Sequence, residues 1–163
     1  MSAIDIRFDL SNEAALDFIR KYDFAFARRQ LIFDVEALRA VLLGAESAGW
    51  SLKRIGDEIL AATNLDNRVC EMLAQTETIR AANAAALASY LKAGIERVVW
   101  IADSRSCQYC RKLSRKAIPI GKPFLESGPF QARKNGRALL IRESVFSPPL
   151  HWDCRCAVSA DVV

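Results

Sequence analysis

The sequence predicts an α+β protein, in which an N-terminal helical region of about four helices, one of them long, precedes a small β-rich zinc-knuckle module. Three observations predict this order. Apolar residues recur at helical spacing between capping residues over the first part of the chain. After Gly94, β-branched residues take over, and prolines and glycines then separate short apolar runs. Cysteines and the only histidine gather in two short clusters near the end of the sequence.

Capping residues indicate where the first helices begin. The pair Ser11-Asn12 can cap a helix that runs to about Arg29, because short polar side chains accept hydrogen bonds from the free N–H groups of a first turn. Asp34 can cap a second helix, which ends at Gly49, where glycine tolerates the left-handed conformation of a helix end. Ser51 then begins a third, short helix.

The longest predicted element covers residues 66–93, with Asp66 as its N-cap and Gly94 as its stop. Its alanine-rich part has high helix propensity and allows close approach by another helix or another chain. Cys70, within this helix, is expected to be a small buried hydrophobe. Trp50, Trp100 and Trp152 are expected to anchor a core or an interface rather than to stack on bases.

Residues 95–102 change to β-type residues and predict a strand, with Cys107 and Cys110 in a turn at its end. Residues 111–150 predict two or three short strands with long loops, and their apolar runs are 117–120 and 138–141. We place the boundary between a helical region, residues 1–94, and a zinc-binding module, residues 95–163, near Gly94.

The two cysteine and histidine clusters read Cys107-x-x-Cys110 and His151-x-x-Cys154-x-Cys156. Thiolates and imidazoles bind tetrahedral Zn2+, and two short chelating clusters joined by a loop are a common form of structural zinc site. Five candidates compete for four positions. The first pair and two members of the second cluster would complete the tetrahedron, and the sequence leaves open which two. The remaining residue can hydrogen-bond the site.

An enzyme is the alternative interpretation of the same residues. One cysteine would attack a substrate and His151 would serve as its base, but the other cysteines would then have no role. A catalytic zinc needs an open position and usually a nearby general base. Glu143 and Asp153 are near in sequence, yet neither stands in a recognisable motif. We therefore expect no catalysis and no small-molecule substrate.

Composition and hydropathy exclude other classes. With 52% hydrophobic and 26% charged residues, the 163-residue chain has the composition of a folded globular protein. No run of about 18 apolar residues exists to span a bilayer. The first residues lack the basic and apolar segments of a secretory signal, so we expect synthesis in a reducing cytoplasm. There, clustered cysteines bind metal more often than they form disulfides.

Positive charge is concentrated next to the first cysteine pair. Residues 105–142 hold ten Lys and Arg and one acid, Glu126, whereas residues 1–104 hold 12 Lys and Arg against 15 acids. Such a segment can contact a phosphate backbone or an acidic protein surface, or it can be a solvated loop. The candidate contact residues are Arg105, Arg111, Lys112, Arg115, Lys116, Lys122, Arg133, Lys134 and Arg137.

Four polar residues of the long helix form a further group, Thr76, Glu77, Arg80 and Asn83. Helical spacing brings Thr76, Arg80 and Asn83 to one face, and Glu77 with Arg80 is an i, i+3 ion pair. Such pairs usually lie on a surface. Alternatively, these polar residues buttress the zinc module, and both interpretations stay open.

Five motifs occur in a specific order: Gln75-Thr76-Glu77-Thr78-x-Arg80-x-x-Asn83, Tyr90-x-x-x-Gly94, Val99-Trp100, Cys107-x-x-Cys110-x-x-Leu113, and Pro148-Pro149-Leu150-His151-x-x-Cys154-Arg155-Cys156. Together they resemble the phage Mu F-like head morphogenesis family, the minor head proteins of tailed double-stranded DNA phages. The resemblance spans about residues 50–158. The chain departs from the usual pattern at Gln75, at Trp152 and at residues 113–115, and none of these departures removes a candidate ligand.

The resemblance implies a virion protein of the phage head interior, present in the host cytoplasm during assembly, with a structural zinc ion. Such proteins associate with the portal protein and other capsid components, and are linked to the fate of DNA at ejection. The basic segment would then contact packaged double-stranded DNA non-specifically or an acidic portal surface, and the alanine face of the long helix would dock a protein. The alternatives are a free-standing zinc-dependent DNA-binding regulatory protein and a metal-dependent hydrolase or nuclease.

Overall fold

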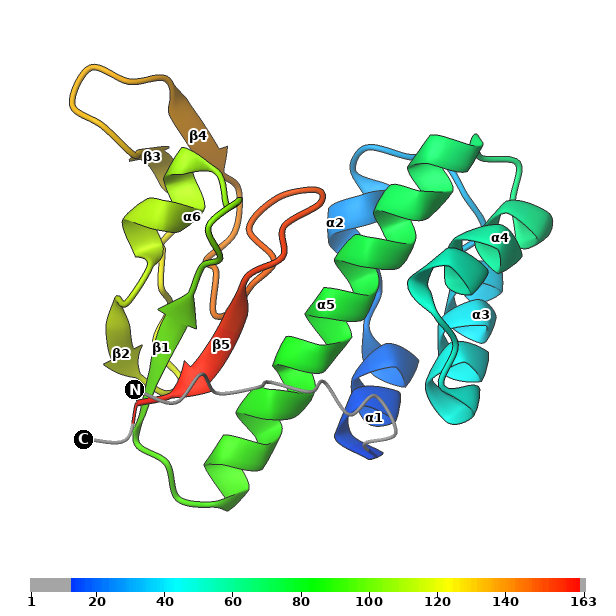
Figure 1. The fold of residues 1–163 in the computed structure, drawn as a ribbon, viewed down its shortest axis with the longest axis horizontal. Coiled ribbons are helices and arrows are strands. Elements are labelled where there is room, and N and C mark those ends of the chain that lie inside the picture. The colour runs from blue at the N-terminus through cyan, green and yellow to red at the C-terminus, as the bar shows by residue number, and fades with distance from the viewer. Residues whose placement is uncertain (1–12, 162–163) are drawn as a thin grey trace.

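A long central helix, α5, lies between a group of helices and a small β module in the computed structural model, which describes residues 13–161 (Figure 1). The four described helices that precede α5 in the sequence form this group. Their bounds, with that of α5, are α1 Glu13–Lys21, α2 Ala25–Arg28, α3 Val35–Ala48, α4 Leu52–Ala62 and α5 Asn67–Lys92.

The capping residues of α3, α4 and α5 are those that the sequence predicted. The side chains of Asp34, Ser51 and Asp66 accept hydrogen bonds from backbone N–H groups of the first turn of these three helices. Gly49 ends α3 in the left-handed conformation, with φ of 63°. Local polar chemistry therefore fixes three helix starts and one helix end.

The prediction of one helix as far as Arg29 is wrong. Helix α1 ends at Lys21, and Phe24 adopts a left-handed φ of 54° before the single turn of α2. Phe24 is buried in the core of the helical region, so tertiary packing of its ring overrides the helical pattern of its neighbours. The predicted cap at Ser11-Asn12 lies outside the described residues.

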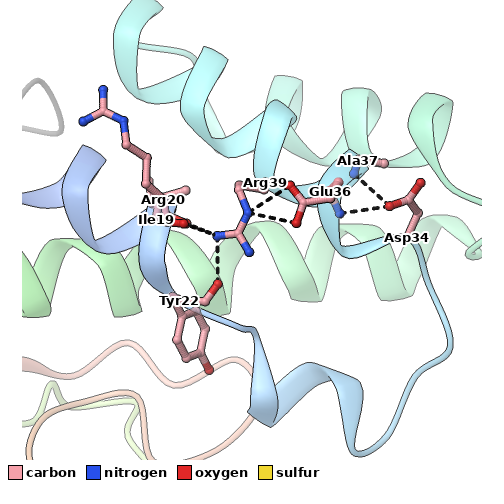
Figure 2. A network of polar contacts seen from close by, with 7 residues as sticks. All are labelled: Ile19, Arg20, Tyr22, Asp34, Glu36, Ala37 and Arg39. Atoms are coloured by element: carbon pink, nitrogen blue, oxygen red, sulfur yellow. Dashed lines mark hydrogen bonds and ion pairs between the residues drawn. The ribbon is translucent and has the colours of Figure 1, made fainter.

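Arg39 of α3 holds the end of α1 (Figure 2). Its guanidinium donates hydrogen bonds to the backbone carbonyls of Ile19, Arg20 and Tyr22. These carbonyls belong to the last turn and exit of α1, where C=O groups lack helical partners. The same guanidinium pairs with Glu36, so α3 both packs on α1 and terminates it.

The alanine-rich part of α5 packs within its own chain. Helix α5 contacts α1 and α4 on one side and the module on the other. The close approach that the alanines allow is therefore used intramolecularly, and their expected role as a docking face for another protein is wrong for the most buried ones. These are Ala74, Ala81, Ala82 and Ala85.

The β module contains two antiparallel sheets. The first has the strand order β2-β1-β5, and the second is the hairpin β3-β4. The predicted strand at 95–102 is confirmed as β1, and the run 138–141 is confirmed as β4. The bounds are β1 Arg97–Ile101, β2 Ala117–Pro119, β3 Gly128–Gln131, β4 Ala138–Ile141 and β5 Ala157–Ala160, with the short helix α6 Gln108–Leu113 between β1 and β2.

Two hydrophobic cores lie on the two sides of α5. The helical core contains buried residues between Ile19 and Ala81, and the module core contains buried residues between Val98 and Val158. Trp100 is fully buried in the module core, as expected of an anchor, with its ring edge-to-face on Phe124 at 5.2 Å between centroids. Helix α5 supplies side chains to both cores.

We expect Arg39→Met to destabilise the helical region by about 1–3 kcal/mol, because the carbonyls at the end of α1 lose their charged donor. The matched control is Arg20→Met, which removes only an exposed ion pair with Glu13 and should cost no more than about 1 kcal/mol. Urea unfolding followed by far-ultraviolet circular dichroism measures both. Equal midpoints for the two variants would contradict the role of Arg39.

Candidate metal centre

Strand pairing brings the two cysteine clusters together. In the antiparallel pair of β1 and β5, Ile101 is opposite Ala157, so the end of β1 lies next to the start of β5. The segment that follows β1 carries the first cluster, and the loop that precedes β5 carries the second. Two clusters far apart in sequence therefore meet at one edge of the sheet.

The first cluster lies at the start of α6, which corrects the predicted turn. Cys107 is the N-cap of α6, and its Sγ accepts a hydrogen bond from the backbone N–H of Cys110. A six-residue helix is too short to give a periodic signal, so the sequence pattern indicated only a turn. The cap nevertheless orients the Sγ atoms of Cys107 and Cys110 toward the same ligand cluster.

The donor atoms of all five candidate residues lie close together in two groups that share Cys110. The first group is Cys107, Cys110 and His151, and the second is Cys110, Cys154 and Cys156. His151 Nε2 lies 3.1 Å from Cys107 Sγ and 3.3 Å from Cys110 Sγ. Cys110 Sγ lies 3.8 Å from Cys154 Sγ. Within each group, all donor atoms are within 4.8 Å of one another.

The separation of two of the sulfurs fits a tetrahedral zinc ion. With Zn–S bonds of about 2.3 Å, two thiolates of one tetrahedron are about 3.8 Å apart, which is the separation of the Cys110 and Cys154 sulfurs. All the cysteines are free thiols, so no disulfide competes for them. The donor set is sulfur and imidazole, which suits zinc better than calcium or magnesium.

The protonation of the thiols also fits a cation. Cys110, Cys154 and Cys156 are all buried. Hydrogen bonding from Cys110 lowers the pKa of the Cys154 thiol, and the hydrogen bond with Cys154 in turn raises the pKa of the Cys110 thiol. Ionisation of one thiol therefore opposes ionisation of its neighbour, whereas a divalent cation stabilises several thiolates together.

His151 is oriented by a backbone contact. Its Nδ1 lies 2.6 Å from the carbonyl oxygen of Trp152. A carbonyl oxygen only accepts hydrogen bonds, so Nδ1 carries the proton and Nε2 presents its lone pair to the cysteines. A metal-ligating histidine commonly has such a partner, which fixes its tautomer.

Ser106 is a neighbour of the cluster that the sequence analysis missed. Its hydroxyl lies 3.6 Å from Cys156 Sγ and also hydrogen-bonds Asp103 Oδ1, whose second contact is the backbone N–H of Arg105. This turn orders the chain immediately before Cys107. A serine before a Cys-x-x-Cys motif is the only sequence signal that could have indicated it.

A cavity of about 450 Å³ opens beside the donor atoms. Its lining includes both ligand clusters, the ion pair of Asp103 with Arg105, and the charged residues Asp153 and Arg155. Arg105, a predicted contact residue, therefore lies at the candidate metal centre.

Two polar residues of α5 contact the second ligand cluster. Thr76 Oγ1 accepts a hydrogen bond from the backbone N–H of Asp153 at 3.2 Å. Asn83 donates to the carbonyl of Cys156 at 3.3 Å and accepts from the N–H of Val158 at 2.7 Å. Both α5 side chains are completely buried, so two members of the predicted group, Thr76 and Asn83, point toward the ligand segment.

The surface interpretation of the Glu77–Arg80 ion pair is wrong. The atoms Arg80 Nε and Glu77 Oε2 are 3.1 Å apart, and the Glu77 side chain is only 1% exposed. Burial raises the pKa of Glu77, and the charge of Arg80 opposes this rise. The Arg80 guanidinium lies over the ring of Phe26 at 5.0 Å and over that of Tyr22 at 5.5 Å. The pair therefore joins α5 to the segment around α2.

The nine predicted contact residues are exposed but fall into separate places. Arg111 and Lys112 lie on α6, while Arg115, Lys116 and Lys122 follow it. A third set lies between β3 and β4, in the hairpin turn that projects from the module (Figure 1). This set is Arg133, Lys134 and Arg137.

Fold and site together define a small α+β protein whose Cys and His residues can hold a metal ion. The chain belongs to the Phage Mu protein F like family, whose model matches residues 36–159. The resemblance is confirmed, and the family suggests a structural phage head morphogenesis protein of the virion. Neither curated proteins nor solved structures give a match. Among the described helices, none has the length and apolar character needed to cross a membrane.

We expect Cys110→Ser to abolish metal binding, because Cys110 is the donor that both groups share. The control is Cys70→Ser, which changes a fully buried thiol of α5 that belongs to neither group. Elemental analysis of the purified variants measures the metal content per chain. A Cys110→Ser protein that retains as much metal as Cys70→Ser would rule out this centre.

Proposed function

We propose that this protein is a minor head protein of a tailed phage, carried in the head interior, with a structural zinc ion and no catalytic activity. The match to the family over residues 36–159 is the observation that carries the proposal. Association with the portal protein and with DNA is part of the same proposal, and each has its own test below.

A structural role for the ion is supported by the donor set. A structural zinc site is closed by four protein ligands, whereas a catalytic site keeps one position for water. Five sulfur and nitrogen donors surround this centre, and no described carboxylate belongs to either donor group. Glu143, one acid near in sequence, instead pairs with Arg29 at 3.0 Å. When bound, zinc would neutralise the buried thiolates and hold α6 against the loop before β5.

The β3–β4 hairpin is the best candidate for a DNA contact. Its turn is ordered by hydrogen bonds from Gln131 Nε2 to the Gly136 carbonyl and from the Gly136 N–H to the Arg133 carbonyl. The Tyr109 hydroxyl of α6 donates to the Arg137 carbonyl at 2.8 Å and anchors the hairpin to the module. A preformed, exposed basic turn suits sequence-independent contact with phosphates.

We expect the triple change Arg133→Ala, Lys134→Ala and Arg137→Ala to weaken binding to double-stranded DNA. The slope of log affinity against log salt should become shallower by about 0.9 for each phosphate that the variant no longer neutralises. A matched control removes three exposed cations of the helical region, Arg20, Lys21 and Lys53. If both triple variants weaken DNA binding equally, the loss comes from net charge and not from the hairpin. Tight, sequence-selective DNA binding by the wild-type chain would instead support a regulatory protein.

We expect the wild-type chain to co-purify with the portal protein of its own phage when the two are produced together. The hairpin variant separates the two candidate partners. If it loses the portal but keeps DNA binding, the basic turn contacts an acidic protein surface. Absence of the chain from purified procapsids would contradict the proposed head location.

A further inference from the structure

The segment from Leu150 to Cys156 contacts both cores of the molecule. We propose that this segment is a joint through which metal binding locks the helical region onto the β module. The inference rests on the proposed zinc site and goes beyond it, because it assigns the ion an effect on helices that supply no ligand.

Residues of this segment are divided between the two cores. Leu150, Cys154 and Cys156 are buried in the module core. Trp152, between them, packs instead against the helical core. One short loop therefore carries three candidate ligands, His151, Cys154 and Cys156, and the side chain that reaches the opposite core.

Trp152 is held by residues in and next to α2. Its indole Nε1 donates a hydrogen bond to Gln30 Oε1 at 2.8 Å, and its ring meets that of Phe26 edge-to-face at 4.8 Å. The other partner of Phe26 is the guanidinium of Arg80, which pairs with the buried Glu77. The ring of Phe26 in α2 therefore contacts both the indole of the ligand segment and a guanidinium of α5.

Helix α5 holds the middle of the same segment and its C-terminal end. Thr76 receives the N–H of Asp153, and Asn83 bridges the carbonyl of Cys156 and the N–H of Val158. The amide of Asn83 also donates to the carbonyl of Ile79, so both its N–H bonds and its oxygen are used. Buried backbone groups that lost such a partner would be left unsatisfied.

Metal binding and helix docking act on the same backbone. An ion held by His151 and Cys154 fixes the chain on both sides of Trp152, and His151 Nδ1 contacts the Trp152 carbonyl directly. Fixing this backbone places the indole against Gln30 and Phe26. Coupling between two binding events is reciprocal, so the contacts from α2 and α5 must raise metal affinity as much as the metal stabilises those contacts.

The test measures zinc affinity in the full chain by competition with a chromophoric chelator. Thr76→Val and Trp152→Phe each remove one hydrogen bond of the joint, and we expect zinc affinity to fall about 10–100-fold, as for other residues that position ligands. Thr76→Ser keeps the hydroxyl and should bind zinc like the wild type. Leu38→Ala opens the helical core without removing a hydrogen bond of the joint, so it controls for general loss of stability.

Hydrogen exchange of the wild-type chain gives a second, independent readout. Removing zinc with a chelator should speed exchange of amides in residues 22–31, around α2, more than in α3 and α4, because the hydrogen bond and ring contact of Trp152 go to Gln30 and Phe26. This measurement needs no variant and does not depend on whether the substituted proteins fold.

The outcomes separate this inference from the proposed function. A wild-type chain that binds no zinc overturns both. The joint is overturned, and the structural zinc site kept, by two results together. Zinc affinity would be the same in Thr76→Val, Trp152→Phe and Leu38→Ala, and amides of residues 22–31 would exchange equally with and without zinc. Lower affinity in the two joint variants alone, with faster exchange around α2, establishes it.

Discussion

Three buried thiols next to one imidazole are the constraint on which the module depends. Cys110, Cys154 and Cys156 lie away from solvent, and a thiolate there needs compensation by hydrogen bonds or by positive charge. Hydrogen bonds within the group allow one thiolate at the expense of its neighbour. A divalent cation resolves this conflict, and it would join α6 to the strand β5 at the edge where their segments meet.

Helix α5 connects the ligand segment to the helical region. It presents buried alanines to α1 and α4 and two buried polar residues, Thr76 and Asn83, to the ligand segment. The Glu77–Arg80 pair extends this polar layer to the rings of Tyr22 and Phe26. Small side chains give close packing, and polar side chains give a defined position, so one helix both fills the helical core and supports the site (Figure 1).

Much of the fold and of the site could be predicted because local chemistry decided it. Asp34, Ser51 and Asp66 cap their helices without help from tertiary packing, and ligand spacing alone indicated the five residues whose donor atoms the fold brings together. The rest depends on distant partners. The break at Phe24 follows from burial of its ring, and the strand β5, four residues long, is defined by its pairing with β1. The contact of Trp152 with Gln30 joins residues far apart in the sequence.

X-ray absorption at the zinc edge, on protein purified without added metal, tests the central claim most directly. We expect one zinc ion per chain, bound by sulfur at about 2.3 Å and by nitrogen at about 2.0–2.1 Å. That result would match the groups that Cys110 shares with His151 and with Cys154. Protein without metal, with free thiols or with a disulfide between Cys110 and Cys154, would contradict the account.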